Sequence, residues 1–189
     1  MREKNTPSLL ERLGRTRRLR HAICEERERL YRLAWSWSHD QHMPEDLVQE
    51  TLARALDKLD SLRDETRLAA WLTRIMANLF RDQFRRQRED TGQDAEPVTE
   101  ETPEEAADRS QLVQHTREAI AALNDDHRQI ITLVDLAGFS YADAAQILDV
   151  PVGTVMSRLS RARGRLRELL AQVHLNDRVV VPLRKRYSS

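Results

Sequence analysis

Arginine is concentrated in one helical stretch near the C-terminal end of the sequence. Between residues 152 and 170, Val155, Leu159 and Leu166 recur at the spacing of an inward-facing apolar stripe. The arginines fall mostly outside that stripe. Their planar, permanently charged groups suit paired hydrogen bonds to phosphates and to base edges in the major groove. The pattern favours a DNA-reading helix, and the alternative is an amphipathic helix whose arginine face is only solvated.

The residues that precede this helix favour the first interpretation. Ser140 and Asp143 have the spacing of a capping box at the start of a helix. Ala145 supplies the small residue that two crossing helices need, and the segment 149–151 supplies a tight turn. Asp149 stands where glycine is common, and Asp tolerates the left-handed conformation better than most residues. Residues 140–167 are therefore predicted to form a helix-turn-helix.

Composition excludes several classes of protein. The chain has 189 residues, 31 of them basic and 31 acidic, and a single cysteine, Cys24. One cysteine excludes an internal disulfide and a cysteine-based metal site, and the six histidines show no paired ligand spacing. We find no nucleophile–base constellation, so we predict no enzymatic activity, metal or cofactor. With no signal peptide and no apolar run near 18 residues, we expect a cytoplasmic protein without membrane insertion.

The sequence divides into two helical parts around an acidic stretch. Between residues 91 and 118 eight acidic residues face two basic ones, with almost no large apolar side chains. Such a segment cannot bury enough surface to offset its conformational entropy. We therefore predict an all-α fold with two small helical domains joined by a flexible acidic linker. The expected ranges are 1–21 for an N-terminal extension, 22–88, the linker 89–110, 111–172, and a tail 173–189.

The first domain is expected to contain three helices. Apolar recurrence predicts helices over Ala22–Trp37, from Pro44 onward, and over about Arg67–Arg88. The second helix has a polar patch opposite its apolar stripe, suited to docking another protein, although solvated helix faces commonly look the same. The third ends in a basic patch that includes Arg81 and Arg85. In the second domain a helix begins near Ser110 and another covers Asp126–Leu136.

Three segments occur together in one order: PEDLVQETLARALDKLDSL, AAWLTRIMANLFRDQFRRQR and DDHRQIITLVDLAGFSYADAAQILDVPVGTVMSRLSRARGRLREL. Together they resemble bacterial RNA polymerase sigma factors of the extracytoplasmic-function (ECF) class, over roughly residues 22–170. The resemblance implies a region 2 domain at 22–88 and a region 4 domain at 111–172. It implies promoter-specific initiation through minus-10 and minus-35 elements. The implied partners are promoter DNA, core RNA polymerase through its beta-prime clamp helices and beta flap, and an anti-sigma factor.

The resemblance also implies roles for individual residues. Docking on core polymerase falls to Asp46, Leu47, Gln49, Glu50 and Arg54. Contact with the minus-10 element falls to Leu62, Arg63, Trp71, Arg74, Asn78, Arg81 and Arg85. Contact with the minus-35 element falls to Thr154, Met156, Ser157, Arg158, Arg161 and Arg163. Leu62 stands where many relatives have an aromatic residue, and Met156 where arginine is common.

A second function is compatible with the helix-turn-helix alone. The chain would then be a free-standing transcriptional regulator that binds operator DNA as a dimer, with the N-terminal bundle for sensing or dimerisation. That alternative gives no role to the EDLVQET segment or to Asn78.

Overall fold

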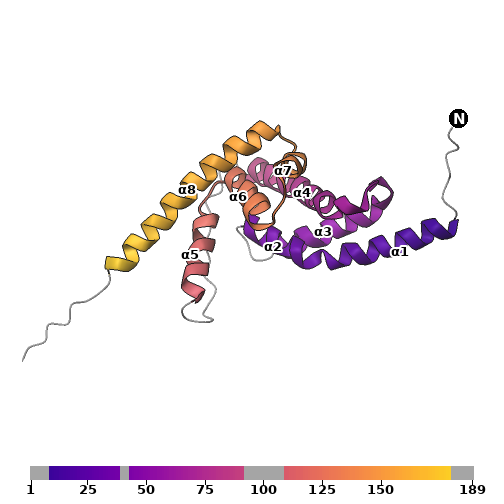
Figure 1. The fold of residues 1–189 in the computed structure, drawn as a ribbon, viewed down its shortest axis with the longest axis horizontal. Helices are drawn as coiled ribbons and strands as arrows, with labels where there is room; N and C mark the ends of the chain where they lie inside the picture. The colour runs from indigo at the N-terminus through magenta and orange to yellow at the C-terminus, as the bar shows by residue number, and fades with distance from the viewer. Residues whose placement is uncertain (1–8, 39–42, 92–108, 180–189) are drawn as a thin grey trace, which may run out of the picture.

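The computed structural model describes residues 9–38, 43–91 and 109–179, and in these ranges every regular element is helical. The predicted all-α fold is confirmed. Figure 1 shows the order of the elements along the chain. Most of the acidic segment and the two chain ends fall outside the described residues. We call α1–α4 with their short turns the first module, and α5–α8 the second module.

The first helix begins well before the predicted start at Ala22. α1 (Leu9–Glu25) carries Leu19 and Ile23, one helical turn apart, into the core. α2 (Arg27–Trp37) follows after Glu26. The helix expected over Ala22–Trp37 is therefore the end of α1 followed by all of α2, and half of the stretch expected as an extension belongs to the fold.

The remaining helices of the first module form around α2. α3 (Met43–Asp57) begins next to Pro44, as the proline and the acidic first turn predict. Two short 3₁₀ turns, Leu59–Ser61 and Glu65–Arg67, shape the connection to α4 (Leu68–Thr91). The apolar stripe of α4 is buried, with Leu72, Met76 and Phe80 in the core. Its exposed side is left for other contacts.

The second module contains the helix-turn-helix. α5 (Arg109–Ala121) leads to α6 (Asp125–Ile131), and Asn124 caps α6, its side-chain oxygen accepting a hydrogen bond from the His127 amide at 2.9 Å. A π-helical turn (Thr132–Leu136) completes the segment expected as one helix over Asp126–Leu136. α7 (Tyr141–Leu148) and α8 (Val152–Val179) follow, and α8 extends seven residues beyond the expected boundary at 172.

The local geometry of the helix-turn-helix matches the sequence signals. The Ser140 hydroxyl accepts a hydrogen bond from the Asp143 amide at 3.1 Å and donates one to its carboxylate at 2.7 Å. Asp149 has φ +56° and ψ +49°, the left-handed conformation that the turn requires. Val155 is fully buried where α8 meets α7. The predicted capping box and the predicted left-handed Asp are both confirmed.

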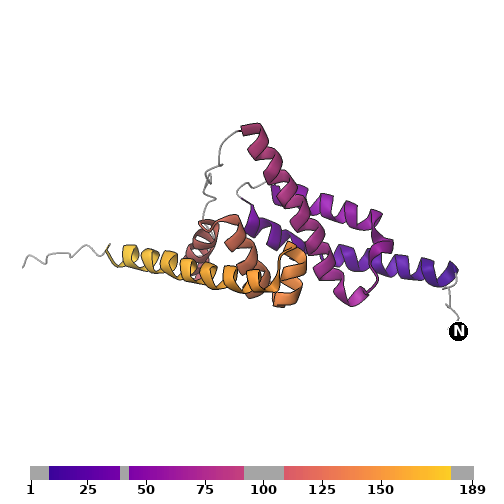
Figure 2. The same cartoon turned by 90° about the horizontal axis from the view of Figure 1, so that it is seen from above.

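The two modules pack against each other and share one hydrophobic core. Figures 1 and 2 show α7 beside α4, and α6 beside α2. Long α8 lies on the outside of the second module, on the side away from α1. The sequence predicts two helical parts, but it carries no signal for their packing together.

The packing of α1 gives a direct test of the fold. Leu19 is 2% exposed, whereas Leu13 on the same helix is 60% exposed. Leu19→Ala should lower the free energy of unfolding by about 2–4 kcal/mol, because it removes buried methyl groups and leaves a cavity. Leu13→Ala should change it by less than about 0.5 kcal/mol. Urea denaturation followed by circular dichroism measures both, and equal effects would contradict the burial of α1.

Candidate nucleic-acid interface

The outward face of α8 is built from small and basic residues. Val155, Leu159 and Ala162 are buried and fix which side of the helix points inward. At about 100° per residue, the side opposite them carries Ser157 and Arg161, both exposed. Ser160 and Gly164 lie on this outward side too. The small side chains leave room for a flat or grooved partner to approach the helix backbone closely.

Two arginines on the borders of this face are paired with carboxylates of the same module. Arg158 forms an ion pair with Asp126 at 3.0 Å. Arg163 donates two hydrogen bonds to Asp135, at 3.0 and 2.6 Å. The hydrogen bonds from Arg163 to Asp135 are the main reason that the pKa of Arg163 is raised above its ordinary value. Both guanidinium groups are thus held in place beside the outward face.

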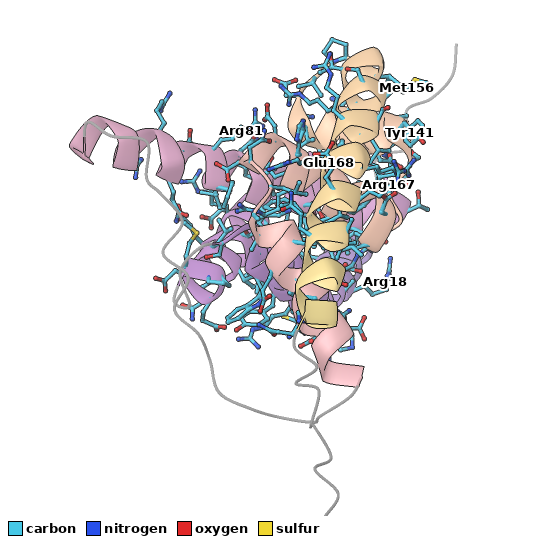
Figure 3. The ribbon with its side chains drawn as sticks, turned by 90° about the vertical axis from the view of Figure 1, so that its left-hand side faces the viewer. Arg18, Arg81, Tyr141, Met156, Arg167 and Glu168 are labelled. Atoms are coloured by element: carbon cyan, nitrogen blue, oxygen red, sulfur yellow. The ribbon has the colours of Figure 1, made fainter. Side chains whose placement is uncertain are left out.

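Met156 and Thr154 lie at the N-terminal end of the same helix. Met156 is exposed and lines a shallow surface groove with Tyr141 and Arg163, and Arg167 lines its far end. Figure 3 shows Met156, Tyr141 and Arg167 along one side of α8. Thr154 is half-buried. The residues predicted to contact the minus-35 element therefore all belong to α8, but Met156 and Arg163 share the side with the groove.

A second row of basic and polar side chains lies along α4. At helical spacing the row takes in five predicted contacts of the minus-10 element. Four of these side chains are exposed, and the Trp71 ring is half-buried and packs against the core. The Arg81 guanidinium donates to the side-chain oxygen of Asn78, which ties two members of the row together. The row consists of Trp71, Arg74, Asn78, Arg81 and Arg85.

The connection before α4 holds the two remaining predicted contacts in different ways. Leu62 is 3% exposed and packs in the core, while Arg63 beside it is exposed. Arg15 of α1 donates to the Leu62 carbonyl and pairs with Glu65 at 3.0 Å. We call residues 59–67 the α3–α4 loop. Its shape is fixed by Leu62 from below and by Arg15 from the side.

The Asp64 side chain makes a local turn at the tip of this loop. Its carboxylate accepts hydrogen bonds from the Thr66 hydroxyl at 2.6 Å and from the Thr66 amide at 3.0 Å. These two bonds hold the pKa of Asp64 below its ordinary value, the hydroxyl contributing most. The turn directs the exposed Arg63 away from the core, next to the N-terminal end of α4.

An acidic face lies on α3, apart from both basic surfaces. Asp46, Gln49 and Glu50 are exposed on one side of the helix, and Arg54 donates to Glu50 at 2.7 Å. Leu47, the fifth predicted docking residue, is fully buried, so it supports this face from within the core and does not project from it. Surface and support come from alternate positions of the same helix.

The most heavily bonded polar group of the structure was not anticipated by the sequence analysis. Arg128 of α6 is 2% exposed, and its guanidinium donates to the carbonyls of Ala121 and Leu123 at 2.6 Å each and to the Trp37 carbonyl at 3.0 Å. Burial lowers its pKa, and nearby Asp125 partly offsets this. A lone arginine in a helical pattern gives no sequence signal of burial, so no periodicity rule could have found it.

The described parts of the chain contain no cluster of three or more His, Cys, Asp or Glu side chains that could hold a metal ion. None of the described helices is long and apolar enough to span a membrane. The surfaces available to a partner are therefore the α8 face, the α4 row with the α3–α4 loop, and the α3 face.

Comparison with known proteins assigns both modules to one family. Residues 23–89 match Sigma-70 region 2, and residues 116–166 match Sigma-70 region 4. The chain is 38% identical over 154 residues to the ECF RNA polymerase sigma factor EcfG of Rhodopseudomonas palustris, covering 80% of this chain and 84% of that one. It is 31% identical over 157 residues to ECF RNA polymerase sigma factor SigW of Bacillus subtilis, covering 76% and 84%.

Solved structures agree with this assignment. The fold is similar to the sigma factor RpoE of Bartonella quintana, crystallised with the anti-sigma factor NepR, at a TM-score of 0.69 and 36% identity, over 80% of this chain and 95% of that one. It is also similar to CnrH in complex with the cytosolic domain of CnrY, at a TM-score of 0.59 and 26% identity, over 82% and 89%. The chain therefore belongs to the ECF class of RNA polymerase sigma factors, which direct promoter-specific initiation of transcription.

Proposed function

We propose that each module of this sigma factor contacts a separate promoter element, and that α3 docks the chain on core polymerase. The observation that carries the proposal is the separation of two basic surfaces and one acidic surface onto different helices. In this arrangement the chain performs no catalysis itself, because polymerase makes the phosphodiester bonds. It acts where polymerase acts, in the cytoplasm.

The α8 face suits the major groove at the minus-35 element. Arg161 projects from it without a close carboxylate partner among its printed contacts, and Ser157 and Ser160 allow close approach. Arg158 and Arg163 are held beside the face by Asp126 and Asp135. To reach DNA they must exchange these carboxylates for phosphates or base edges. Thr154 and Met156 border the face at its N-terminal end.

The α4 row and the α3–α4 loop suit single-stranded DNA at the minus-10 element. Exposed Arg74, Arg81 and Arg85 can follow a phosphate backbone, and Asn78 offers hydrogen bonds to a base edge. Capture of extruded bases offsets an unstacking cost of a few kcal/mol. Since Leu62 is buried, it supports the loop, and we assign the direct contact at the loop tip to Arg63.

The acidic face of α3 suits a basic surface on the polymerase clamp helices. Asp46 and Glu50 carry the charge, and Gln49 lies between them. Glu45, which precedes them, pairs with Arg27 at 2.6 Å. Its hydrogen bond from Gln49, together with Arg27, lowers the pKa of Glu45, so this part of the helix stays charged.

Weak separate contacts are sufficient when polymerase holds both modules. The formal net charge of zero gives little counterion release, so the free chain gains little nonspecific affinity for duplex DNA. Tethering on one polymerase turns the second contact into an intramolecular one at high effective concentration. We also propose an anti-sigma factor as a partner, because two similar sigma factors were solved in complex with one.

A run-off transcription assay with purified core polymerase tests this function. The chain should allow core polymerase to start at specific promoters, whereas a free-standing regulator would add no initiation of its own. Transcripts that appear equally with and without the protein would contradict the proposal. Promoters can be obtained by sequencing DNA that co-purifies with the protein and polymerase.

Arg161 provides the test of the minus-35 surface. Arg161→Ala should weaken discrimination at the minus-35 element by about 1–3 kcal/mol, because a lost base contact has that magnitude. The measurement is competition between a promoter and the same promoter with a substituted minus-35 element. Arg117→Ala removes the same charge from an exposed position on α5 and should leave the ratio unchanged. An unaltered ratio in both variants would refute the placement of the face.

Glu50 provides the test of polymerase docking. Glu50→Arg places a cation against the proposed basic partner and should lower affinity for core by about 2 kcal/mol or more, roughly thirtyfold. Co-purification or fluorescence anisotropy with labelled protein measures the loss. Glu28→Arg makes the same change at an exposed position on α2 and should bind normally. Normal binding by both would exclude α3 as the docking helix.

Arg15 provides the test of the loop. Arg15→Ala removes the contacts with Leu62 and Glu65 and should speed amide hydrogen exchange across residues 60–67 by roughly fivefold, since exposed charged hydrogen bonds contribute about 1 kcal/mol. Promoter opening, measured by permanganate footprinting, should fall while core binding is retained. Arg17→Ala, at an exposed position two residues on, is the control. Unchanged exchange and opening would show that α1 does not position the loop.

A further inference from the structure

The surface between the modules has its own set of polar contacts. The Trp37 indole N–H, at the end of α2, donates to the Thr132 hydroxyl oxygen at 2.7 Å. The Trp37 carbonyl accepts from the Arg128 guanidinium at 3.0 Å. Trp37 and Thr132 are both fully buried, and Trp37 packs edge-on against Phe80 at 5.6 Å between ring centroids. One residue of the first module is thus bonded at two points to α6 and the π-helical turn that follows it.

Two further arginines cross the same boundary from the first module. The Arg29 guanidinium lies 4.7 Å from the centre of the Phe139 ring and donates to the Ala137 carbonyl at 3.2 Å. Arg67, at the end of the α3–α4 loop, pairs with Asp143 of α7 and donates to Gln146 at 3.0 Å. These contacts hold the start of the helix-turn-helix against α2 and α4.

The geometry of a promoter does not permit this arrangement. The minus-35 and minus-10 elements lie about 25 base pairs apart, which is roughly 85 Å at ~3.4 Å per base pair. In the structure α7 of the minus-35 module is in direct contact with α4, the helix of the minus-10 row (Figures 1 and 2). Both modules cannot engage their elements until α7 leaves α4.

We infer that the surface formed by α2 and α4 is a docking site for the chain's own helix-turn-helix module, and that this docking keeps the free sigma factor in a closed, inactive state. The inference rests on the proposed function for its consequence at promoters. Closure occupies the Arg67 end of the α3–α4 loop and fixes the two DNA-binding surfaces at the wrong separation. Core polymerase and DNA then bind the open state, and every bound chain has first released the interface.

The interface is suited to reversible release. Arg128 keeps its bonds to the carbonyls of Ala121 and Leu123 when the modules part, because those residues belong to its own module. It loses only the bond to Trp37 and regains water. The Arg29 and Arg67 contacts lie toward the surface, where ion pairs and cation–π contacts are individually weak. Opening therefore exchanges protein contacts for hydration without stranding a buried charge.

A distance measurement on the isolated full chain tests the closed state. Cys24, the sole cysteine, is exposed on α1, and Gln172→Cys adds a second label site on α8. Double electron–electron resonance between spin labels at these sites should give one dominant distance in the otherwise unchanged chain. Arg29→Ala should add a longer-distance population, with the open-to-closed ratio raised roughly three- to tenfold. Arg32→Ala, at an exposed position on the same helix, is the matched control.

A second variant tests the interface from the other module. Thr132→Val has nearly the same volume but leaves the Trp37 indole without its acceptor in the closed state, so it should also raise the open population. A broad distribution in the unchanged chain, or the same distribution in all four proteins, would overturn the closed state. Circular dichroism and unfolding midpoints near those of the parent establish that each variant is folded.

The inhibitory consequence is measured separately. If the closed state competes with core binding, Arg29→Ala and Thr132→Val should bind core polymerase roughly three- to tenfold more tightly, since apparent affinity scales with the open fraction. An increased open population with unchanged core affinity would overturn the inhibitory role. Because the distance measurement contains no polymerase, failure of the closed state and failure of the proposed sigma function give different results.

Discussion

The bonds made by Trp37 and Arg128 set the relation between all other parts of the molecule. A buried guanidinium is costly unless each of its donors has a partner, and here the partners are carbonyls at the end of α5 and the end of α2. The same group that closes the second module thereby binds the first. The distance between the two DNA-binding surfaces follows from this single contact point, because each module is otherwise held together by its own apolar core.

Burial of a charge at a module boundary favours specificity of arrangement over strength. An apolar pair at Trp37 and Arg128 would hold the modules more tightly, since buried ion and hydrogen-bond networks are often no more stable than apolar replacements. A hydrogen-bonding arginine instead accepts one geometry and is readily hydrated when that geometry is lost. For a protein that must exist with its modules both together and apart, this is the more useful chemistry.

The sequence predicts the helices and their faces better than their association. Periodicity located the inward stripes of α3, α4 and α8, and the capping signal at Ser140 and the left-handed Asp149 were predicted from local chemistry alone. The start of α1 was missed because Leu19 and Ile23 continue a stripe that was begun only at Ala22. The burial of Leu62 and Arg128 depends on what packs over them, and a single helical period carries no information on that.

The pairing of arginines also explains how a chain without net charge can bind DNA. Arg158, Arg163 and Arg67 each have a carboxylate partner in the second module, namely Asp126, Asp135 and Asp143. DNA phosphates compete with these carboxylates for the same guanidinium groups, so binding is an exchange of anions and gains less than addition of a new pair. Arg161 is exposed on the outward face between the paired arginines. Selectivity is then concentrated in few contacts, and polymerase supplies the remaining affinity by holding both modules on one promoter.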